Sequence, residues 1–460
     1  MKQSYIKSLL AAVSVCCAMG VSAQALHSSY FLDGMVQRHE LNAAFGGEAN
    51  FIAIPGISGF QLGASTNFGL ANFVFHNPSG DGLLLGLSKQ ISAEQFLGGL
   101  PINNQLDVQL EIPVLSVGFR GMGGFNTITI KERTFIGANI PSSLFSFLKL
   151  GADPTTGIAR YDIDNLTINT NNYVELALGH SRKLDALEGF SYGAKLKFLV
   201  GAFGATVSME HIGIEMSANK WMVQTQGYAA LSSGLQFDYD ENNELSGINS
   251  ENLGLGGFGM GVDLGAVYTP AALPDLTVSV GVNDIGFISW NDVSTVTTKG
   301  EFEYTGFETI TTDEATLNEQ IDDLVDDVMG LIKLQPGETV TQQKMLQTTL
   351  NVGAEYAILN RKISFGLLSS TRFGAPYTYA EGMAVVNFRP ASWFQAAING
   401  SISTQGAAVG ALLTFCPNGA NIFFGCDYVT PNMKFSAEGI PLYATRANLR
   451  TGIIVTFGKK

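Results

Sequence analysis

Apolar and polar side chains alternate with a period of two along many segments of this chain, a pattern that predicts β-strands with two different faces. Residues 446–460 show it most clearly. One face is apolar, ends on an aromatic ring and consists of Leu449, Thr451, Ile453, Val455 and Phe457. The other face carries Arg446, Asn448 and Arg450. An apolar face that ends on an aromatic residue near the terminus favours the closing strand of a membrane barrel over the edge of a soluble β-sandwich.

The same alternation recurs through the chain. It is strongest in residues 115–120, 192–203, 257–268, 276–283 and 350–356, and it continues in 363–373, 377–390, 394–404, 408–416 and 422–429. The polar faces are mostly Gly, Ser, Thr and Asn with single charges, as in a water-filled lumen rather than on the outside of a sandwich. The sequence therefore predicts an all-β transmembrane antiparallel β-barrel of about 14 strands, in a range of roughly 14 to 18.

Three short helices are expected between the strands. Ser92–Leu100 opens with a capping box of Ser92 and Gln95, and Pro141–Leu150 starts with a proline at a helix N-terminus. Both are expected to cover a barrel end. The third lies in residues 307–345, where apolar residues follow helical spacing after a capping box of Thr311 and Glu314. This long connection predicts a helical, lid-like loop insertion.

The third helix has an acidic face, made of Asp322, Asp323, Asp326 and Asp327. Carboxylates one turn apart can hold Ca²⁺, but a dedicated calcium site uses an oxygen-rich loop with a turn glycine, which this segment lacks. A solvated helix face is the favoured interpretation.

The N-terminus predicts export. Lys2 and Lys7 precede an apolar run and the small-residue site Val21, Ser22, Ala23, so residues 1–23 are expected to be a cleaved signal peptide. Its removal leaves 24 Lys and Arg against 40 Asp and Glu, a formal charge of −16. Nucleic acid is therefore excluded as a partner. The expected location is the outer membrane of a Gram-negative cell, with outer-membrane lipid around the barrel.

Composition supports one large domain from residue 57 to residue 460. No Pro-rich, Ser-rich or charged linker divides the chain, which contains 53 glycines and 10% aromatic but only 14% charged residues. After residue 23 no clean apolar run of about 20 residues occurs, so no transmembrane helix is predicted.

Charges on the predicted inward faces are the candidate site residues, namely Arg120, Lys195, Lys197, Asp263, Glu355, Arg389, Arg446 and Arg450. They are expected to form an internal salt-bridge network that fills the lumen. The alternative is ligand contact, and the excess of cations would suit a carboxylate headgroup.

Catalytic chemistry is not indicated. The pattern GxGxxG at Gly254–Gly259 leads into a strand instead of a helix, and the five histidines have no accompanying metal or hydrolase motif. We expect no enzyme, no metal and no cofactor. Cys416 and Cys426 flank a predicted turn, and both a disulfide with a shifted register and two buried thiols are compatible with their spacing.

Several segments together resemble a family of uncharacterised outer-membrane barrels of Bacteroidota, related in architecture to PorV and to FadL-type fatty-acid transporters. They are SYFLDGMVQRHELNAAF, ISAEQFLGGL, FNTITIKERTFIGANIPSSLFSFLKLG, TTLNVGAEYAI and GIIVTFGKK. The most specific is similar to an Arg-His-x-Leu-Asn-Pro-Ala-Phe motif and falls on Arg38, His39, Leu41, Asn42, Ala43, Ala44 and Phe45, with Ala43 in place of the proline.

The resemblance implies that this motif belongs to a plug or hatch inside the barrel, within residues 24–56. It also implies passive uptake of a small hydrophobic or amphipathic molecule, with an apolar pocket between the hatch and the wall. The alternative is a PorV-like adaptor or structural protein, which would have a secretion-machinery protein as its partner. An open porin and an outer-membrane hydrolase fit the sequence less well.

Overall fold

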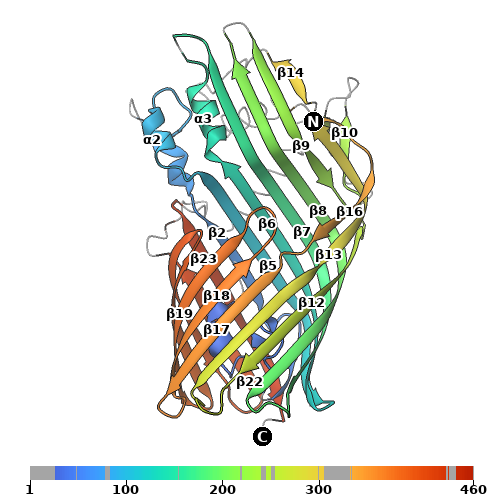
Figure 1. Ribbon diagram of the computed structural model, residues 1–460, viewed down its shortest axis with the longest axis vertical. Coiled ribbons are helices and arrows are strands. Elements are labelled where there is room, and N and C mark those ends of the chain that lie inside the picture. The colour runs from blue at the N-terminus through green and yellow to red at the C-terminus, as the bar shows by residue number, and fades with distance from the viewer. Residues whose placement is uncertain are drawn as a thin grey trace.

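A computed structural model describes residues 26–47, 49–77, 83–153, 155–217, 220–239, 245–249, 254–298, 300–304, 332, 334–430, 434 and 442–458. Within these residues the chain forms one closed antiparallel β-barrel (Figure 1). The predicted signal peptide and the acidic helix of the predicted insertion lie outside the described residues. No described helix is long and apolar enough to cross a membrane.

Nineteen strands form the main sheet, and several of them share one place in the wall. Four places are shared: β1 (Asn50–Ala53) and β2 (Phe60–Thr66) form the first, β9 (Trp221–Leu231) and β12 (Gly257–Tyr268) another, β13 (Leu276–Thr298) and β14 (Glu301–Tyr304) the next, and β15 (Leu334–Pro336), β16 (Val340–Met345) and β17 (Thr349–Ile358) the one after that. Between the first and second of these shared places lie β5 (Asn103–Gly121), β6 (Gly124–Pro141), β7 (Ala159–Lys183) and β8 (Phe190–Met216). After the last shared place come β18 (Ile363–Arg372), β19 (Tyr379–Ala391), β20 (Phe394–Ser403), β21 (Gly406–Phe415), β22 (Ala420–Val429) and β23 (Thr445–Phe457). The described residues thus make a barrel of 14 strands, as predicted.

The barrel closes between its last and first strands. Residues of β23 pair with both β1 and β2, which pair in turn with β5. Between β1 and β2 the wall is interrupted, and Gly59 ends the interruption at a φ of +85°. A Cβ at Gly59 would lie 1.5 Å from the carbonyl oxygen of Thr451, so only glycine fits there. The wall therefore begins at Asn50, earlier than the predicted residue 57.

One side of the barrel is much taller than the other. Strands β17, β18 and β20–β22 have 10 residues each, which matches the span of a membrane, while β7 has 25 and β8 has 27. The short connections and the C-terminus lie at one end, here called the turn end (Figure 1). The tall strands extend toward the other end, here called the loop end. The tall side makes a collar above the shorter wall.

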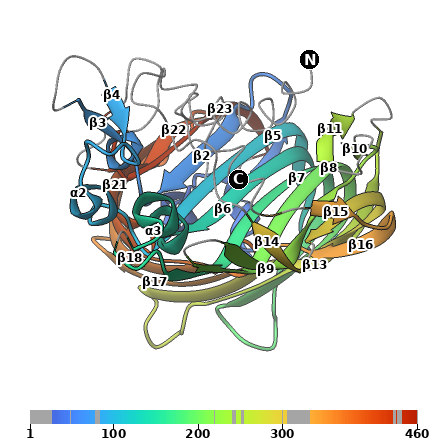
Figure 2. The same cartoon turned by 90° about the horizontal axis from the view of Figure 1, so that it is seen from above.

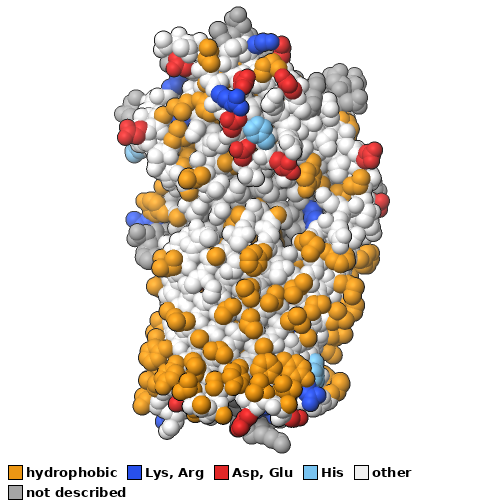
Figure 3. All heavy atoms as spheres, in the orientation of Figure 1, with side chains coloured by type: hydrophobic (Ala, Val, Ile, Leu, Met, Phe, Trp, Pro, Cys, Tyr) orange, Lys and Arg blue, Asp and Glu red, His pale blue; other side chains and the backbone are white. Residues whose placement is uncertain are grey.

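The outer face of the shorter wall is apolar. Side chains gather there in a broad band that is densest near the turn end, while charged residues concentrate near the loop end (Figure 3). The predicted closing strand follows this pattern, because Ile453, Val455 and Phe457 are exposed and Arg446 and Arg450 are buried. Exposed aromatic residues of the band include Tyr356, Phe365, Phe388, Trp393, Phe415 and Phe424. Such a band is typical of strands that face lipid.

Short helices and hairpins lie at the loop end (Figure 2). They are η3 (Leu70–Asn72), the hairpins β3 (Val74–His76) with β4 (Leu83–Leu85) and β10 (Gln236–Tyr239) with β11 (Leu245–Asn249), α2 (Ala93–Leu97) and α3 (Ser142–Leu150). The two predicted helices form as expected: the Ser92 hydroxyl caps α2 by accepting from the Gln95 amide, and Pro141 precedes α3. The end of the predicted 307–345 insertion is strand, because β15 and β16 pair with β13.

Residues 26–46 lie inside the barrel, toward the turn end, and are called the hatch (Figure 1). The hatch contains two 3-10 helices, η1 (His27–Phe31) and η2 (Val36–Glu40). Its apolar side chains make up much of a core that also includes inward residues of the wall. The hatch is therefore packed as a folded part of the domain.

Candidate functional site: the hatch and the cavity above it

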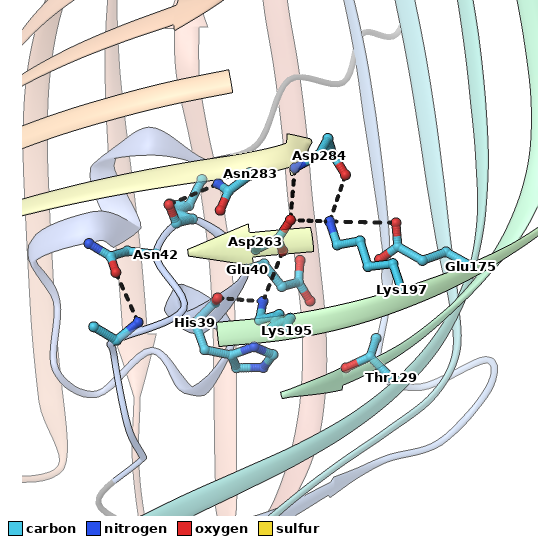
Figure 4. Close-up of polar contacts among 12 residues, drawn as sticks. His39, Glu40, Asn42, Thr129, Glu175, Lys195, Lys197, Asp263, Asn283 and Asp284 are labelled. Atoms are coloured by element: carbon cyan, nitrogen blue, oxygen red, sulfur yellow. Dashed lines mark hydrogen bonds and ion pairs between the residues drawn. The ribbon is translucent and has the colours of Figure 1, made fainter. Parts of the chain in front are cut away.

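Asn42 organises the hatch. Its Oδ1 accepts a hydrogen bond from the Ala44 amide at 2.9 Å, and its Nδ2 donates to the Tyr30 hydroxyl and to the Val280 carbonyl, both at 3.1 Å. The side chain is fully buried. One residue thus closes a turn within the hatch (Figure 4) and also joins that turn to strand β13.

Wall side chains donate to carbonyl groups of the hatch. The Lys195 ammonium donates to the His39 carbonyl at 2.5 Å, and the amides of Asn283 and Asn351 both donate to the Leu41 carbonyl at 3.0 Å. On another side, the Arg389 guanidinium donates to the Phe31 carbonyl. These bonds satisfy buried backbone groups that a short irregular segment cannot satisfy alone.

Two wall glycines allow the hatch backbone to approach the strands. A Cβ at Gly193 would lie 2.1 Å from the Ala43 carbonyl oxygen, and a Cβ at Gly265 would lie 2.0 Å from Asn42 Oδ1. The sequence has small residues at these inward positions, so β8 and β12 pack directly against the hatch. A larger side chain at either glycine position would displace the hatch from the strands.

The first residues of the hatch are held by the opposite wall. The amide and hydroxyl of Ser28 donate to the Asp427 carboxylate, and His27 lies 3.2 Å from Glu381. Glu381 also pairs with Arg446 at 3.3 Å. Together with the contacts above, these bonds fix the hatch to strands on several sides of the barrel.

A buried charge network lies beside the hatch (Figure 4). Lys197 Nζ is 2.6 Å from Asp284 Oδ1 and 2.8 Å from Asp263 Oδ1. Arg133 contacts the same Asp284 at 3.0 Å and Glu175 at 3.1 Å. Each buried carboxylate in this group has a cationic partner, as burial of charge requires. The network rigidifies the lumen wall.

Glu40 connects the hatch to this wall. Its carboxylate is 3.0 Å from Arg450 and 3.9 Å from Lys131, which in turn pairs with Glu111 at 2.9 Å. Burial tends to raise the pKa of Glu40, but the charges of Arg450 and Lys131 outweigh it and hold the pKa well below its ordinary value. Glu40 is therefore ionised, and it contributes an ionic contact to hatch docking.

His39 is buried in a different way. Its ring stacks on Phe51, with 5.9 Å between ring centroids, and neither ring nitrogen has a hydrogen-bond partner among the described residues. Burial and the nearby Lys195 charge lower the pKa of His39 to about 3. The imidazole is neutral and packs as an aromatic ring.

A cavity of about 330 Å³ lies above the hatch, with Glu40 and Leu41 in its floor. Charged residues line part of it, including Lys131, Arg133, Asp284 and Lys197. Another part is apolar and aromatic and is formed by Tyr173, Tyr228, Ile288, Trp290 and Leu346. The hatch thus does not fill the lumen. The pocket was expected to be apolar, but its lining is amphipathic. Its volume falls in the range of small-molecule sites.

The structure brings most of the predicted lumen charges together. Lys195, Lys197 and Asp263 form one cluster, Glu355 pairs with Arg389 at 2.6 Å, and Arg446 and Arg450 bind Glu381 and Glu40 as described. Arg120 differs: it shares the inward face of β5 but lies near the β5–β6 turn, where it is exposed and its guanidinium contacts the Gly47 carbonyl.

The residues of the predicted hatch motif lie in and beside η2. His39, Leu41, Asn42 and Phe45 are buried inside the barrel, whereas Arg38 is partly exposed. Arg38 pairs with Asp33 at 2.6 Å and lies over the Phe45 ring at 4.5 Å.

Other residues of the site were not found from the sequence. Asp284 follows Asn283 directly, and both are buried because the β12–β13 register shifts between Val262 and Leu264. Strict alternation would have placed one of them outside. Lys131 and Arg133 lie in the polar run Lys131, Glu132, Arg133 and Thr134 of β6, where the alternation of apolar and polar residues is lost and does not assign a face.

Cys416 and Cys426 are not joined in a disulfide. In the β21–β22 register Cys426 lies opposite Ala411, while Phe415 lies opposite Ile422. The two cysteines are therefore separated along the hairpin. The change of register that would bring them opposite each other, as a disulfide requires, does not occur. No group of His, Cys, Asp and Glu within the described residues has the arrangement of a metal site.

These features define a class of protein: a 14-stranded antiparallel barrel of the outer-membrane type, with a folded hatch in its lumen. The chain belongs to the family of unknown function DUF5723, whose model matches residues 43–427. Among curated protein sequences, none matches the chain.

Solved structures of similar size resemble it distantly. The toluene transporter TbuX of Ralstonia pickettii has 9% identity and a TM-score of 0.42, with 96% of this chain and 97% of that chain covered. The toluene transporter TodX of Pseudomonas putida has 8% identity, a TM-score of 0.38 and 96% coverage of both chains. A FadL homologue of Pseudomonas aeruginosa has 10% identity and a TM-score of 0.35, with 91% and 92% covered. Likenesses at this level carry no argument about function.

Proposed function

We propose that this protein is a passive outer-membrane channel that takes up a small amphipathic molecule and is closed at rest by its hatch. The observation that carries the proposal is the cavity of about 330 Å³ directly above the hatch. Its lining combines paired charges with an aromatic and aliphatic surface, which suits a molecule with one polar and one apolar part.

The resting hatch would oppose free diffusion. It contacts wall residues of β8, β13, β17, β19, β22 and β23. A polar solute in the lumen therefore meets packed side chains at the turn end, the end that faces the periplasm in bacterial outer-membrane barrels. Passage would require the hatch to shift, and binding in the cavity would supply part of the free energy for that shift.

Flux into liposomes tests this proposal. Hexanesulfonate and hexyltrimethylammonium are amphipathic and carry permanent charges, so they cross a bilayer slowly without a protein, and arabinose is a polar solute of similar size. The purified protein should admit at least one of the amphiphiles faster than arabinose, relative to protein-free liposomes. Equal entry of all three solutes would indicate an open pore, and entry of none would contradict uptake.

A second candidate function is a PorV-like adaptor for a secreted or secretion-machinery protein. It is favoured by the collar, whose long strands rise beyond the apolar band, and by exposed apolar residues near the loop end such as Ile102, Leu150 and Ile158. Purification from the native membrane in mild detergent separates the two: a stoichiometric protein partner together with no amphiphile flux would support the adaptor.

A further inference from the structure

Lys344 differs from the other cations that line the cavity. Each of the others has a carboxylate partner within ion-pair distance, and they are Lys131, Arg133, Lys197 and Arg372. Lys344 lies on β16 and forms no ion pair with any described carboxylate. Its ammonium donates instead to the hydroxyl of Thr206.

The Thr206 hydroxyl positions the Lys344 ammonium but does not compensate its positive charge. The Thr206 hydroxyl donates its one proton to Asn169 Oδ1 at 3.3 Å, so it accepts from Lys344. An ammonium carries three N–H donors, and this bond uses one of them. The remaining two are available to an acceptor in the cavity.

Trp290 supplies a second donor on the same wall. The indole is fully buried, and its Nε1 has no hydrogen-bond partner among the described residues. Ile288 lies directly opposite Lys344 in the β13–β16 register, and Trp290 is two residues further along β13. Lys344 and Trp290 therefore share the inward face as diagonal neighbours, within reach of one small group.

Two glycines of β8 leave room for the indole. A Cβ at Gly204 would lie 3.2 Å from the Trp290 ring, and a Cβ at Gly201 would lie 2.4 Å from it. Thr206 is two residues from Gly204 on the same face of β8. The ring therefore packs on β8 beside the Lys344–Thr206 hydrogen bond.

The surface around these two donors is apolar. Tyr173, Ile288 and Trp290 belong to one core cluster, against which Tyr228 and Leu346 also pack. All five line the cavity. An acceptor bound to Lys344 would thus have an apolar body beside it.

We propose that Lys344 and Trp290 form the head-group subsite for a small amphipathic anion, with Thr206 as the positioning residue for the lysine. The inference rests on the proposed function and names its ligand class. A carboxylate or sulfonate accepts from both the ammonium and the indole N–H, and the bond from the ammonium is charge-assisted. The apolar body then lies on the surface formed by Tyr228, Ile288 and Leu346.

Calorimetry on the full-length protein in detergent tests the subsite, with hexanesulfonate, hexyltrimethylammonium and hexanol as probes. Hexanesulfonate should bind more tightly than the other two. Lys344→Met should weaken hexanesulfonate at least tenfold and leave hexanol unchanged, while Lys344→Arg should retain most of the affinity. Lys183→Met, at the exposed end of β7, is the matched control and should bind as the wild type does.

Two results would overturn the subsite: hexanesulfonate affinity that Lys344→Met does not change, or hexyltrimethylammonium binding as tight as that of hexanesulfonate. A heat-modifiability gel shows that each variant barrel is folded. Flux separates this failure from failure of uptake itself. If both amphiphiles outrun arabinose and Lys344→Met has no effect on either, the subsite is wrong and uptake stands. If neither outruns arabinose, uptake is wrong as well.

Discussion

Gly34 of the hatch and Cys416 of the wall are in direct contact. The Cys416 sulfur is 3.6 Å from the Gly34 carbonyl oxygen, and a Cβ built on Gly34 would lie 2.9 Å from that sulfur. In a disulfide each Cβ is roughly 3 Å from the far sulfur, given an S–S bond of about 2.05 Å. The resting hatch thus presents an ideal position for a cross-link to a native thiol.

Gly34→Cys should therefore form a disulfide with Cys416 under mild oxidation. The end of the Gln395 side chain, 2.8 Å from the same Cβ position, has to move, and it is flexible enough to do so. Mass spectrometry after thiol alkylation measures the bond. The double variant Gly34→Cys with Cys416→Ser is the control and should stay reduced. Complete alkylation of both thiols in Gly34→Cys would mean that the hatch does not rest where the structure has it.

Side chains at Gly193 or Gly265 should release the hatch. Gly193→Val and Gly265→Val each place a side chain in space occupied by the hatch backbone or by Asn42. Arabinose leak into liposomes should rise several-fold. Gly400→Val is the matched control, because Gly400 is exposed and no atom of the described residues lies within 4 Å of its Cβ position. Leak that rises equally in Gly400→Val would point to general damage of the barrel.

Asn42→Ala should loosen the hatch more than Arg38→Ala does. The first removes three hydrogen bonds of a buried side chain. The Ala44 amide then loses its acceptor, at a cost of about 1–3 kcal/mol, while the Tyr30 hydroxyl keeps its bond with Ser279 Oγ. The second removes an ion pair and a ring contact at the edge of the hatch, with Asp33 partly exposed. Thermal unfolding and arabinose leak should both rank the variants in this order. A larger effect of Arg38→Ala would contradict the role given to Asn42.

Acid should weaken hatch docking. The pKa of His39 is about 3 when docked, below its ordinary value of about 6.5, so protonation of the released form opposes docking as the pH falls through that window. The pKa of Glu40 is also lowered, so its contribution is present above its ordinary pKa and is lost on further acidification. Both shifts act in the same direction.

Arabinose leak should accordingly rise between pH 7 and pH 4. His39→Phe keeps the stacked ring on Phe51 and removes the titration, so its leak should start to rise only at the lower pH where Glu40 responds. A leak profile identical to that of the wild type would exclude His39 as the group responsible for the upper part of the change.

Sequence patterns could predict the barrel because its two faces meet different solvents. In β23 the period of two separates Arg446 and Arg450 from Ile453 and Val455, and the structure follows it. The two faces of β13 could not be assigned throughout, since a bulge beside Asp263 brings both Asn283 and Asp284 inside. A register shift depends on how a strand pairs with its neighbour, and the sequence of one strand does not show that pairing.

The site was predicted in part for a similar reason. Charges such as Lys197 stand out on a polar face, but their partners come from strands far apart in the sequence. Lys344 lies within the segment predicted as a helical insertion, so its place in the wall could not be expected. Trp290 has the pattern of an ordinary apolar residue of a strand. That its Nε1 has no partner within the described part of the chain becomes visible only once the fold packs its ring on β8.

The measurement that tests the account most directly is amphiphile flux through the cross-linked hatch. Gly34→Cys protein in liposomes should pass amphiphile when reduced, stop when oxidised, and recover when a reductant opens the bond. Gly34→Cys with Cys416→Ser should be indifferent to oxidation. If the fully cross-linked protein passes amphiphile as fast as the reduced one, hatch movement is not part of the route.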